Sequence, residues 1–562
     1  MRSVLLLILS ILTFVASAAS PEASYGEHGM VTSRSEFASQ AGIEVMKEGG
    51  NAVDGAVATA FALAVTYPSA GNIGGGGFAV IRLADGKVVT LDHREKAPAS
   101  ATRDMYLDKD GNEIEGLSRN SHKASGVPGS VDGLLTMQEK YGKLTRKQVI
   151  APAIRLAKDG FVLSRDMALQ FKEVLPSMQQ YPASVAKFTR KDGSLYEEGD
   201  TYRQPELAAV LQRIADKGRD GFYKGKTAEL IAAEMKRGNG NITMDDLANY
   251  HSVWREPIHG TYRGYDIWGM GPPSSGGVMI VQMLNMMEPY DLHAMGYGSA
   301  AAVHLMVEAE RRAYADRAEY LGDPDYYEVP IAKLIEKDYA RKRFADFQPD
   351  KASDSNDIGA GHWPPEHMQT THLSVMDGDG VMVAMTTTLN SSYGNKIVVP
   401  GTGMLLNNEM DDFSIKPNTP NQFNLIGREA NQIEPGKRML SSMSPTIVTK
   451  DGKPVLIAGS PGGSTIITTT LQVIVNVIDH GMSIEDAVSK PRFHHQWKPD
   501  VVMIEPWGLS PDTIEILKKM GHKSLREVRF GRGIGDANSI EYVDGMIRGI
   551  KDPRNEGGAV GY

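Results

Sequence analysis

The sequence of 562 residues contains no cysteine. This absence excludes disulfide bonds, cysteine nucleophiles and metal sites built from cysteine. A chain of this length buries enough apolar surface to fold without covalent cross-links. Its formal net charge of −9 is modest, and its 60 lysine and arginine residues are scattered rather than gathered into a basic tract. The charge pattern therefore argues against nucleic acid as a partner.

Long apolar runs are scarce, and the most pronounced one lies at the start of the chain. Met1-Arg2-Ser3 precedes an almost wholly apolar stretch, residues 4–15, which leads into Ala16-Ser17-Ala18. A basic start, a short apolar core and a small-x-small site predict a signal peptide over residues 1–18. The alternative, a membrane anchor, is weaker because a spanning helix needs roughly 20 apolar residues. We therefore expect an exported protein, periplasmic or secreted, with no membrane span in its mature form.

Motifs for metal, phosphate and serine chemistry are also missing. The histidines at positions 362, 367 and 372 recur at intervals of five, and no His-Glu-x-x-His motif occurs. An interval of five does not align ligands on one face of a helix or strand. The chain has no Gly-x-Ser-x-Gly elbow, and both common glycine-rich phosphate motifs are absent. The sequence therefore implies no metal and no cofactor.

The chain also lacks an obvious linker, a low-complexity tract and an internal repeat. The part before residue 351 is mostly helical in pattern, with helices predicted over residues 35–48, 51–66 and 300–321 and a hairpin over residues 77–83 and 87–92. A polar, irregular segment, residues 351–369, ends just before Thr370. After it, strands are predicted over residues 370–376, 381–389, 446–449 and 454–458, and helices over residues 465–480 and 483–489. Helices on both sides of a strand-rich centre indicate layered α/β packing.

Five short motifs follow one another from the middle of the chain onward. They are Gln369-Thr370-Thr371-His372, Thr388-Leu389-Asn390, residues 407–413, residues 441–445 and residues 459–464. In order and spacing they resemble the γ-glutamyltranspeptidase family, and the resemblance covers essentially the whole mature chain. It implies the four-layer αββα sandwich of N-terminal-nucleophile hydrolases, in which one precursor gives two chains sharing one core. The large subunit would span residues 19–369 and the small subunit residues 370–562.

The candidate nucleophile is Thr370. A threonine hydroxyl is a weak nucleophile that needs a base, and an N-terminal threonine has one in its own α-amine, whose reference pKa is about 7.7–8.0. An internal threonine cannot use this device, so the hypothesis requires cleavage of the Gln369–Thr370 bond. The resemblance implies that Thr370 attacks the preceding carbonyl itself and that water then releases the ester. It also implies that the Thr388 hydroxyl hydrogen-bonds the nucleophile.

Other matched residues would bind the substrate. Gly462 and Gly463 lie in a turn before a predicted helix, where consecutive backbone N–H groups suit a developing oxyanion. The resemblance assigns the α-carboxylate of a γ-glutamyl group to Arg94, Ser441 and Ser442, and its α-ammonium to Asn390, Glu409 and Asp412. Residues 415–437 match a lid. Phe423 stands where many bacterial members carry tyrosine, which removes a hydroxyl from the tip of that lid.

The sequence thus predicts an exported γ-glutamyltranspeptidase and glutathione hydrolase. Thr370 would attack the γ-glutamyl amide of glutathione or a related compound and pass the glutamyl group to water or to an amino acid or dipeptide. One alternative is a cephalosporin or glutaryl acylase of the same superfamily, which would have no reason to keep Glu409 and Asp412. Another is a non-catalytic binding protein, which would stay uncut and still bind ligand when Thr370 is replaced by alanine.

Overall fold

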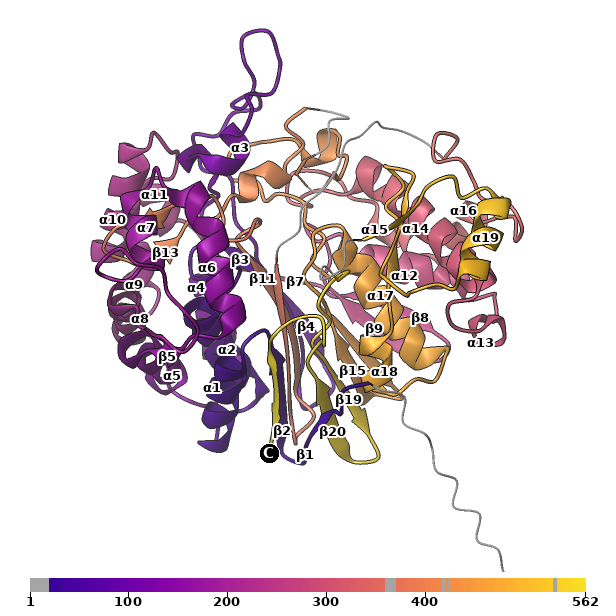
Figure 1. The fold of residues 1–562 in the computed structure, drawn as a ribbon, viewed down its shortest axis with the longest axis horizontal. Helices are drawn as coiled ribbons and strands as arrows, with labels where there is room; N and C mark the ends of the chain where they lie inside the picture. Colours follow the sequence, from indigo (N-terminus) through magenta and orange to yellow (C-terminus); the bar gives the residue numbers. More distant parts are fainter. Residues whose placement is uncertain (1–19, 359–369, 417–420, 423, 529–532) are drawn as a thin grey trace, which may run out of the picture.

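The computed structural model describes residues 20–562 except 359–369, 417–420, 423 and 529–532. The predicted signal peptide and Phe423 lie outside these described residues. Two facing β-sheets form the centre of the molecule, and helices cover the outer face of each (Figure 1). No helix in the described ranges is long and apolar enough to cross a membrane.

The strands of the described residues form two seven-stranded sheets. Sheet I has the order β1 (Ser24–Gly26), β20 (Met546–Ile550), β19 (Ser539–Val543), β15 (Lys453–Ala458), β14 (Thr446–Lys450), β9 (Tyr265–Gly269) and β8 (Ile258–Tyr262). Sheet II has the order β21 (Gly558–Gly561), β2 (Gly29–Ser33), β10 (Thr371–Asp377), β11 (Met382–Thr388), β3 (Gly76–Arg82), β4 (Val88–His93) and β7 (Val253–Arg255). Smaller pairings join β5 (Phe161–Val162) to β6 (Thr201–Tyr202), β12 (Val398–Val399) to β13 (Met404–Leu405), and β16 (Phe493–His494) through β17 (Val502–Ile504) to β18 (Leu525–Glu527).

Three apolar layers hold the sheets and helices together. Side chains from both sheets, including Phe78, Met376 and Ile447, meet between them. The outer face of sheet II packs on one group of helices, and the outer face of sheet I on another. Because both faces of each sheet are covered, β3 and β10 are buried at every position. This arrangement confirms the expected αββα sandwich.

The predicted helices form close to their expected bounds. The helices over sheet II include α1 (Glu36–Lys47), α2 (Ala52–Thr66), α4 (Ser130–Tyr141), α5 (Arg146–Asp159) and α8 (Pro205–Lys217). Those over sheet I include α12 (Gly276–Met287), α14 (Ala300–Tyr320), α17 (Thr465–Ile478) and α18 (Ile484–Ser489). Asn51 and Asp54 make a capping box that fixes the start of α2.

The other helices of the described residues vary in length. They are α3 (Leu117–Asn120), α6 (Arg165–Met178), α7 (Pro182–Phe188), α9 (Asp220–Tyr223), α10 (Gly225–Arg237), α11 (Met244–Ala248), α13 (Leu292–Met295), α15 (Ile331–Leu334), α16 (Lys337–Arg343), α19 (Pro511–Met520) and the 3-10 turns η1 (His122–Ala124), η2 (Glu409–Asp412) and η3 (Glu429–Asn431).

Each sheet contains strands from before and after Thr370, and strands of the two parts pair with one another. In sheet II, β10 lies between β2 and β11, and β11 pairs with β3. In sheet I, β14 pairs with β9. A break in the chain just before Thr370 would therefore separate no strand from its neighbours, because the two parts are joined by ladder hydrogen bonds and three shared cores.

Candidate active site

The register of sheet II places the nucleophile candidate beside two other predicted residues. Thr371 pairs with Thr387 across β10 and β11, so Thr370 lies opposite Thr388 when the register continues by one residue. Thr388 pairs with Gly76, and Gly77 pairs with His93, which sets Arg94 opposite Gly76. Directly opposed residues of antiparallel strands project to the same face. Four neighbouring strands thus aim Thr370, Thr388 and Arg94 into one site.

Glycine is needed in the middle of this row. A Cβ on Gly76 would lie 2.5 Å from the His93 carbonyl oxygen and 2.6 Å from Glu95 Oε2. A Cβ on Gly75 would lie 1.9 Å from the Thr388 carbonyl oxygen. The run of glycines at positions 74–77 therefore serves close backbone packing and leaves room between Thr388 and Arg94.

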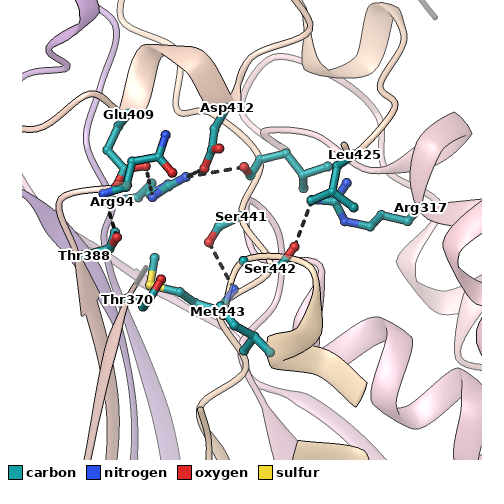
Figure 2. A pocket seen from close by; sticks show the side chains of 14 residues that line it. Arg94, Arg317, Thr370, Thr388, Glu409, Asp412, Leu425, Ser441, Ser442 and Met443 are labelled. Atoms are coloured by element: carbon teal, nitrogen blue, oxygen red, sulfur yellow. Dashed lines mark hydrogen bonds and ion pairs between the residues drawn. The ribbon is translucent and has the colours of Figure 1, made fainter. Parts of the chain in front are cut away.

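These residues open into a pocket with an empty volume of about 300 Å³, part of which is open to solvent (Figure 2). Most of the predicted site residues line it: Arg94, Thr370, Thr388, Asn390, Glu409, Asp412, Ser441, Ser442 and Gly463. Gly462 precedes Gly463 but does not line the pocket, and Phe423 is outside the described residues. The structure adds Arg317, Leu425, Leu440, Met443 and Ile466, which sequence reasoning missed.

Thr370 is itself enclosed, with an exposed fraction of 6%. The Thr388 hydroxyl accepts a hydrogen bond of 2.7 Å from the backbone N–H of Asn390. Asn390 has a φ of 73°, a left-handed conformation that asparagine tolerates, and its Nδ2 donates to the Asn408 carbonyl at 3.0 Å. This tight turn after β11 fixes the Thr388 oxygen next to the position of the nucleophile.

The predicted carboxylate-binding arginine is surrounded by acids in this structure. Arg94 is 1% exposed, and its Nη1 lies 2.6 Å from Glu409 Oε2 and 3.6 Å from Glu95 Oε2. Its Nη2 lies 2.5 Å from Asp412 Oδ2. Burial works against the charged guanidinium, but Glu409 and Asp412 outweigh it and hold the pKa of Arg94 above its usual value. The arginine therefore stays charged.

The acids around Arg94 also have raised pKa values, but for them the cause is burial. Burial raises the pKa of Glu95 to about 8 and that of Asp412 to about 6, although Arg94 opposes both shifts. Burial also raises the pKa of Glu409 well above its usual range. Because burial raises the pKa values of all three carboxyl groups and only one cation faces them, protonation of part of this cluster is favoured at neutral pH. A ligand ammonium would favour the ionised carboxylates and displace those protons.

The two serines lie on a loop that the start of α12 fixes in place. The Ser441 carbonyl accepts hydrogen bonds from the backbone N–H of Ser275 at 2.8 Å and from the Ser275 hydroxyl at 2.7 Å. The Ser441 hydroxyl accepts from the Met443 N–H at 3.1 Å, and the Ser442 hydroxyl accepts from Arg317 Nη2 at 3.3 Å. Each oxygen thus already accepts an N–H, which leaves each O–H to donate to an anion in the pocket.

The glycine turn has the backbone shape that its residues allow. Gly462 has a φ of 135° and Gly463 a φ of 55°, and α17 begins directly afterwards at Thr465. A Cβ on Gly462 would lie 2.4 Å from Thr465 Oγ1. The Gly462 carbonyl accepts from the Thr465 N–H at 3.0 Å, which holds the turn against the helix. Both glycines are therefore required for this conformation, and the N-terminal end of α17 faces the same region.

Arg317 is the charged residue that the structure adds to the predicted site. It projects from α14, is 4% exposed, and donates from Nε to the Ser275 hydroxyl at 3.0 Å as well as to Ser442. Figure 2 shows Ser441 and Ser442 between Arg94 and Arg317. Tyr314, one turn earlier on α14, donates its hydroxyl proton to the Ser464 carbonyl beside the glycine turn. One helix from the part of the chain before Thr370 thus supports both the serine loop and the turn.

A central threonine at the start of an inner strand, set in an αββα sandwich, defines the class as an N-terminal-nucleophile hydrolase. The chain belongs to the γ-glutamyltranspeptidase family, since the profile described as "Gamma-glutamyltranspeptidase" matches residues 38–562. This confirms the resemblance seen in the sequence.

Individual relatives agree with this family assignment. The chain is 49% identical to the "Glutathione hydrolase proenzyme" of Escherichia coli (strain K12), over 98% of this chain and 96% of that one. It is 50% identical to the protein of the same name from Pseudomonas sp. (strain A14), over 100% of this chain and 99% of that one. Among solved structures, cephalosporin acylase from Bacillus halodurans superimposes with a TM-score of 0.85 at 28% identity, over 97% of this chain and 98% of that one.

Proposed function

We propose that this protein is a glutathione hydrolase and γ-glutamyltransferase that creates its own nucleophile by cleaving the Gln369–Thr370 bond. The observation that carries the proposal is the shared pocket of Thr370, a guanidinium, two serine hydroxyls and two acids, Glu409 and Asp412. A γ-glutamyl group carries a free α-carboxylate and a free α-ammonium, and two methylene groups separate its α-carbon from the reactive carbonyl carbon. The pocket offers partners for both charges beside a hydroxyl nucleophile.

The proposed reaction proceeds through an ester. After cleavage, the α-amine of Thr370 takes the proton of its own hydroxyl as Oγ attacks the γ-carbonyl carbon of the donor. The carbonyl oxygen becomes an oxyanion, which the N–H groups of Gly462 and Gly463 stabilise. The C–N bond then breaks, and the departing amine leaves with the transferred proton. Water or an acceptor amine attacks the ester, which releases glutamate or a new γ-glutamyl amide and restores Thr370.

Recognition of the donor would use both charges. We assign its α-ammonium to Glu409, Asp412 and Asn390, which lie along one side of the pocket with Arg94. We assign its α-carboxylate to the O–H groups of Ser441 and Ser442 and to Arg94. Arg94 is paired with Glu409 and Asp412 in this structure, so donor binding exchanges these ion pairs for contacts with the donor. Only the difference in free energy between the two sets of contacts contributes to affinity.

Maturation would give two chains that stay together. Residues 19–369 and 370–562 both contribute strands to each sheet and pair across both sheets, which supports a tight heterodimer after cleavage. The sequence of residues 1–18 supports export to the periplasm or the medium, with removal of that segment. The lid over residues 415–437, with Phe423 at its tip, stays a prediction. No cofactor is needed for any of these steps.

A cephalosporin or glutaryl acylase is the second candidate, because the fold superimposes on a cephalosporin acylase. The two activities differ in what the acyl group carries, since a glutaryl group lacks the ammonium. The test compares L-γ-glutamyl-p-nitroanilide, glutathione and glutaryl-p-nitroanilide at equal concentrations with the purified enzyme. Faster turnover of the two γ-glutamyl donors supports the proposal, whereas preference for the glutaryl donor favours the acylase. Binding without turnover would leave the non-catalytic alternative.

A further inference from the structure

Arg317 is a buried cation without an acidic partner. Arg317 is 4% exposed, yet in the described part of the chain no carboxylate oxygen lies within ion-pairing distance of it, and Asp412 acts on its charge only from further away. Its partners are two hydroxyl oxygens, Ser275 Oγ at 3.0 Å and Ser442 Oγ at 3.3 Å. Burial lowers the pKa of Arg317 to about 10, so it remains charged at neutral pH. An uncompensated buried charge is costly and favours an anion beside it.

The other buried arginines of the same helix are compensated. Arg312 Nη1 lies 2.6 Å from Glu308 Oε2, and its Nη2 lies 2.8 Å from Asp346 Oδ1. Arg311 Nη1 lies 2.6 Å from Asp500 Oδ1. Neither arginine lines the pocket, whereas Arg317 does. The missing counter-charge is therefore specific to the residue that faces the ligand space.

The two arginines of the pocket differ in their capacity to bind a ligand anion. Arg94 has acids on both Nη atoms. Among the described residues, the hydrogen-bond partners of Arg317 are neutral hydroxyl groups, and the Ser442 oxygen that accepts its N–H keeps its own O–H for a ligand. We propose that Arg317 binds the α-carboxylate of the γ-glutamyl donor, together with Ser441 and Ser442, and is a determinant of donor specificity. This inference rests on the proposed function and adds a residue that the family motifs did not supply.

The test uses three anilide donors that separate the two charges of the glutamyl group. L-γ-Glutamyl-p-nitroanilide carries both, 4-aminobutyryl-p-nitroanilide lacks the carboxylate, and glutaryl-p-nitroanilide lacks the ammonium. We expect Arg317→Gln to lower kcat/KM by about 10- to 100-fold, through KM, for the two donors with a carboxylate, since hydrogen bonds to charged groups have this magnitude. Turnover of the 4-aminobutyryl donor should change by less than about two-fold.

Matched variants exclude a purely structural effect. Arg312→Gln removes a buried guanidinium from the same helix outside the pocket, so any loss should be equal on all three donors. Arg317→Lys keeps the charge but loses the planar fork, and it should lie between wild type and Arg317→Gln on the carboxylate donors only. If the Arg317→Gln variant remains uncut, the kinetics of the Arg317→Lys variant on the three donors are compared with those of the wild type instead. Failure of both variants to process would assign Arg317 a structural role and contradict the proposal.

Two further outcomes separate this inference from the proposed function. Equal losses on all three donors in Arg317→Gln, with a wild type that prefers the γ-glutamyl donor, would overturn only the role of Arg317. A wild type that does not favour donors with a carboxylate would overturn the proposed function, and the inference would fall with it.

Discussion

Replacing Asp412 by asparagine should change which donors the enzyme accepts. Asp412 Oδ2 lies 2.5 Å from Arg94 Nη2, and its side chain is 9% exposed at the edge of the pocket. The substitution keeps the shape of the side chain and removes one charge opposite the donor ammonium. A hydrogen bond to a charged group contributes about 1.5–3 kcal/mol, which corresponds to about 10- to 150-fold in KM. A glutaryl donor has no ammonium and should lose much less.

The pH dependence of this effect follows from the pKa of Asp412. Burial raises that pKa to about 6, so the carboxyl group is ionised at pH 8 and neutral well below pH 6. A neutral carboxyl group attracts the ammonium less, and the wild-type KM for a γ-glutamyl donor should therefore rise as the pH falls through about 6. Asp412→Asn should lack this rise, and the glutaryl donor should not show it in either enzyme.

The assay measures kcat and KM for L-γ-glutamyl- and glutaryl-p-nitroanilide between pH 5 and pH 8.5. Asp411→Asn is the matched control, because it makes the same charge change at a buried neighbour outside the pocket. Asp411 accepts hydrogen bonds from the Ser118 hydroxyl at 2.5 Å and the Gln422 N–H at 3.0 Å instead. Equal losses on both donors in Asp412→Asn, or a selective loss in Asp411→Asn, would refute the assignment of the ammonium to Asp412.

Two other substitutions test neighbouring parts of the site. The Arg94→Ala variant should still be cut into two chains. It should raise KM for γ-glutamyl donors at least about 100-fold and lower the free energy of unfolding by about 3–5 kcal/mol, because Glu409 loses a partner at 2.6 Å. Unchanged glutathione kinetics would show that Arg94 does not belong to the site. The Gly462→Ala variant should lower kcat far more than it raises KM. The reason is that a φ of 135° is strained for alanine and the new Cβ would lie 2.4 Å from Thr465 Oγ1. Steady-state kinetics with a normal kcat would show that the turn has no role in stabilising the oxyanion.

Local structure was largely predictable from the sequence. The hairpin around residues 377–380 forms as β10 and β11, and the helix expected over residues 51–66 begins at its asparagine cap. Periodicity and turn residues determine such elements over short distances. The pairing of β2 with β10 and β21, by contrast, joins segments hundreds of residues apart. No local pattern encodes that order, and the αββα arrangement came from the family resemblance.

Site residues that lie in recognisable sequence motifs were predictable, and those outside such motifs were not. Thr370, Arg94 and Asp412 were found through their motifs, and the register of sheet II explains why they meet. Arg317 was missed because α14 carries many charges, and a charged helix usually has a solvated face. Here almost the whole helix is buried, with Glu308 and Arg312 paired inside the protein. Only the three-dimensional packing distinguishes Arg317 from those paired residues.

The most direct test of the central claim is the mass and N-terminal sequence of each chain in the purified protein, beside a Thr370→Ala variant. We predict two chains of about 38 and 21 kDa by residue share, the smaller beginning at Thr370, and a variant that remains uncut and inactive. A single uncut wild-type chain would leave Thr370 without its α-amine base and contradict the proposed mechanism. Cleavage of the Thr370→Ala variant at the same bond would show that another group performs the cut.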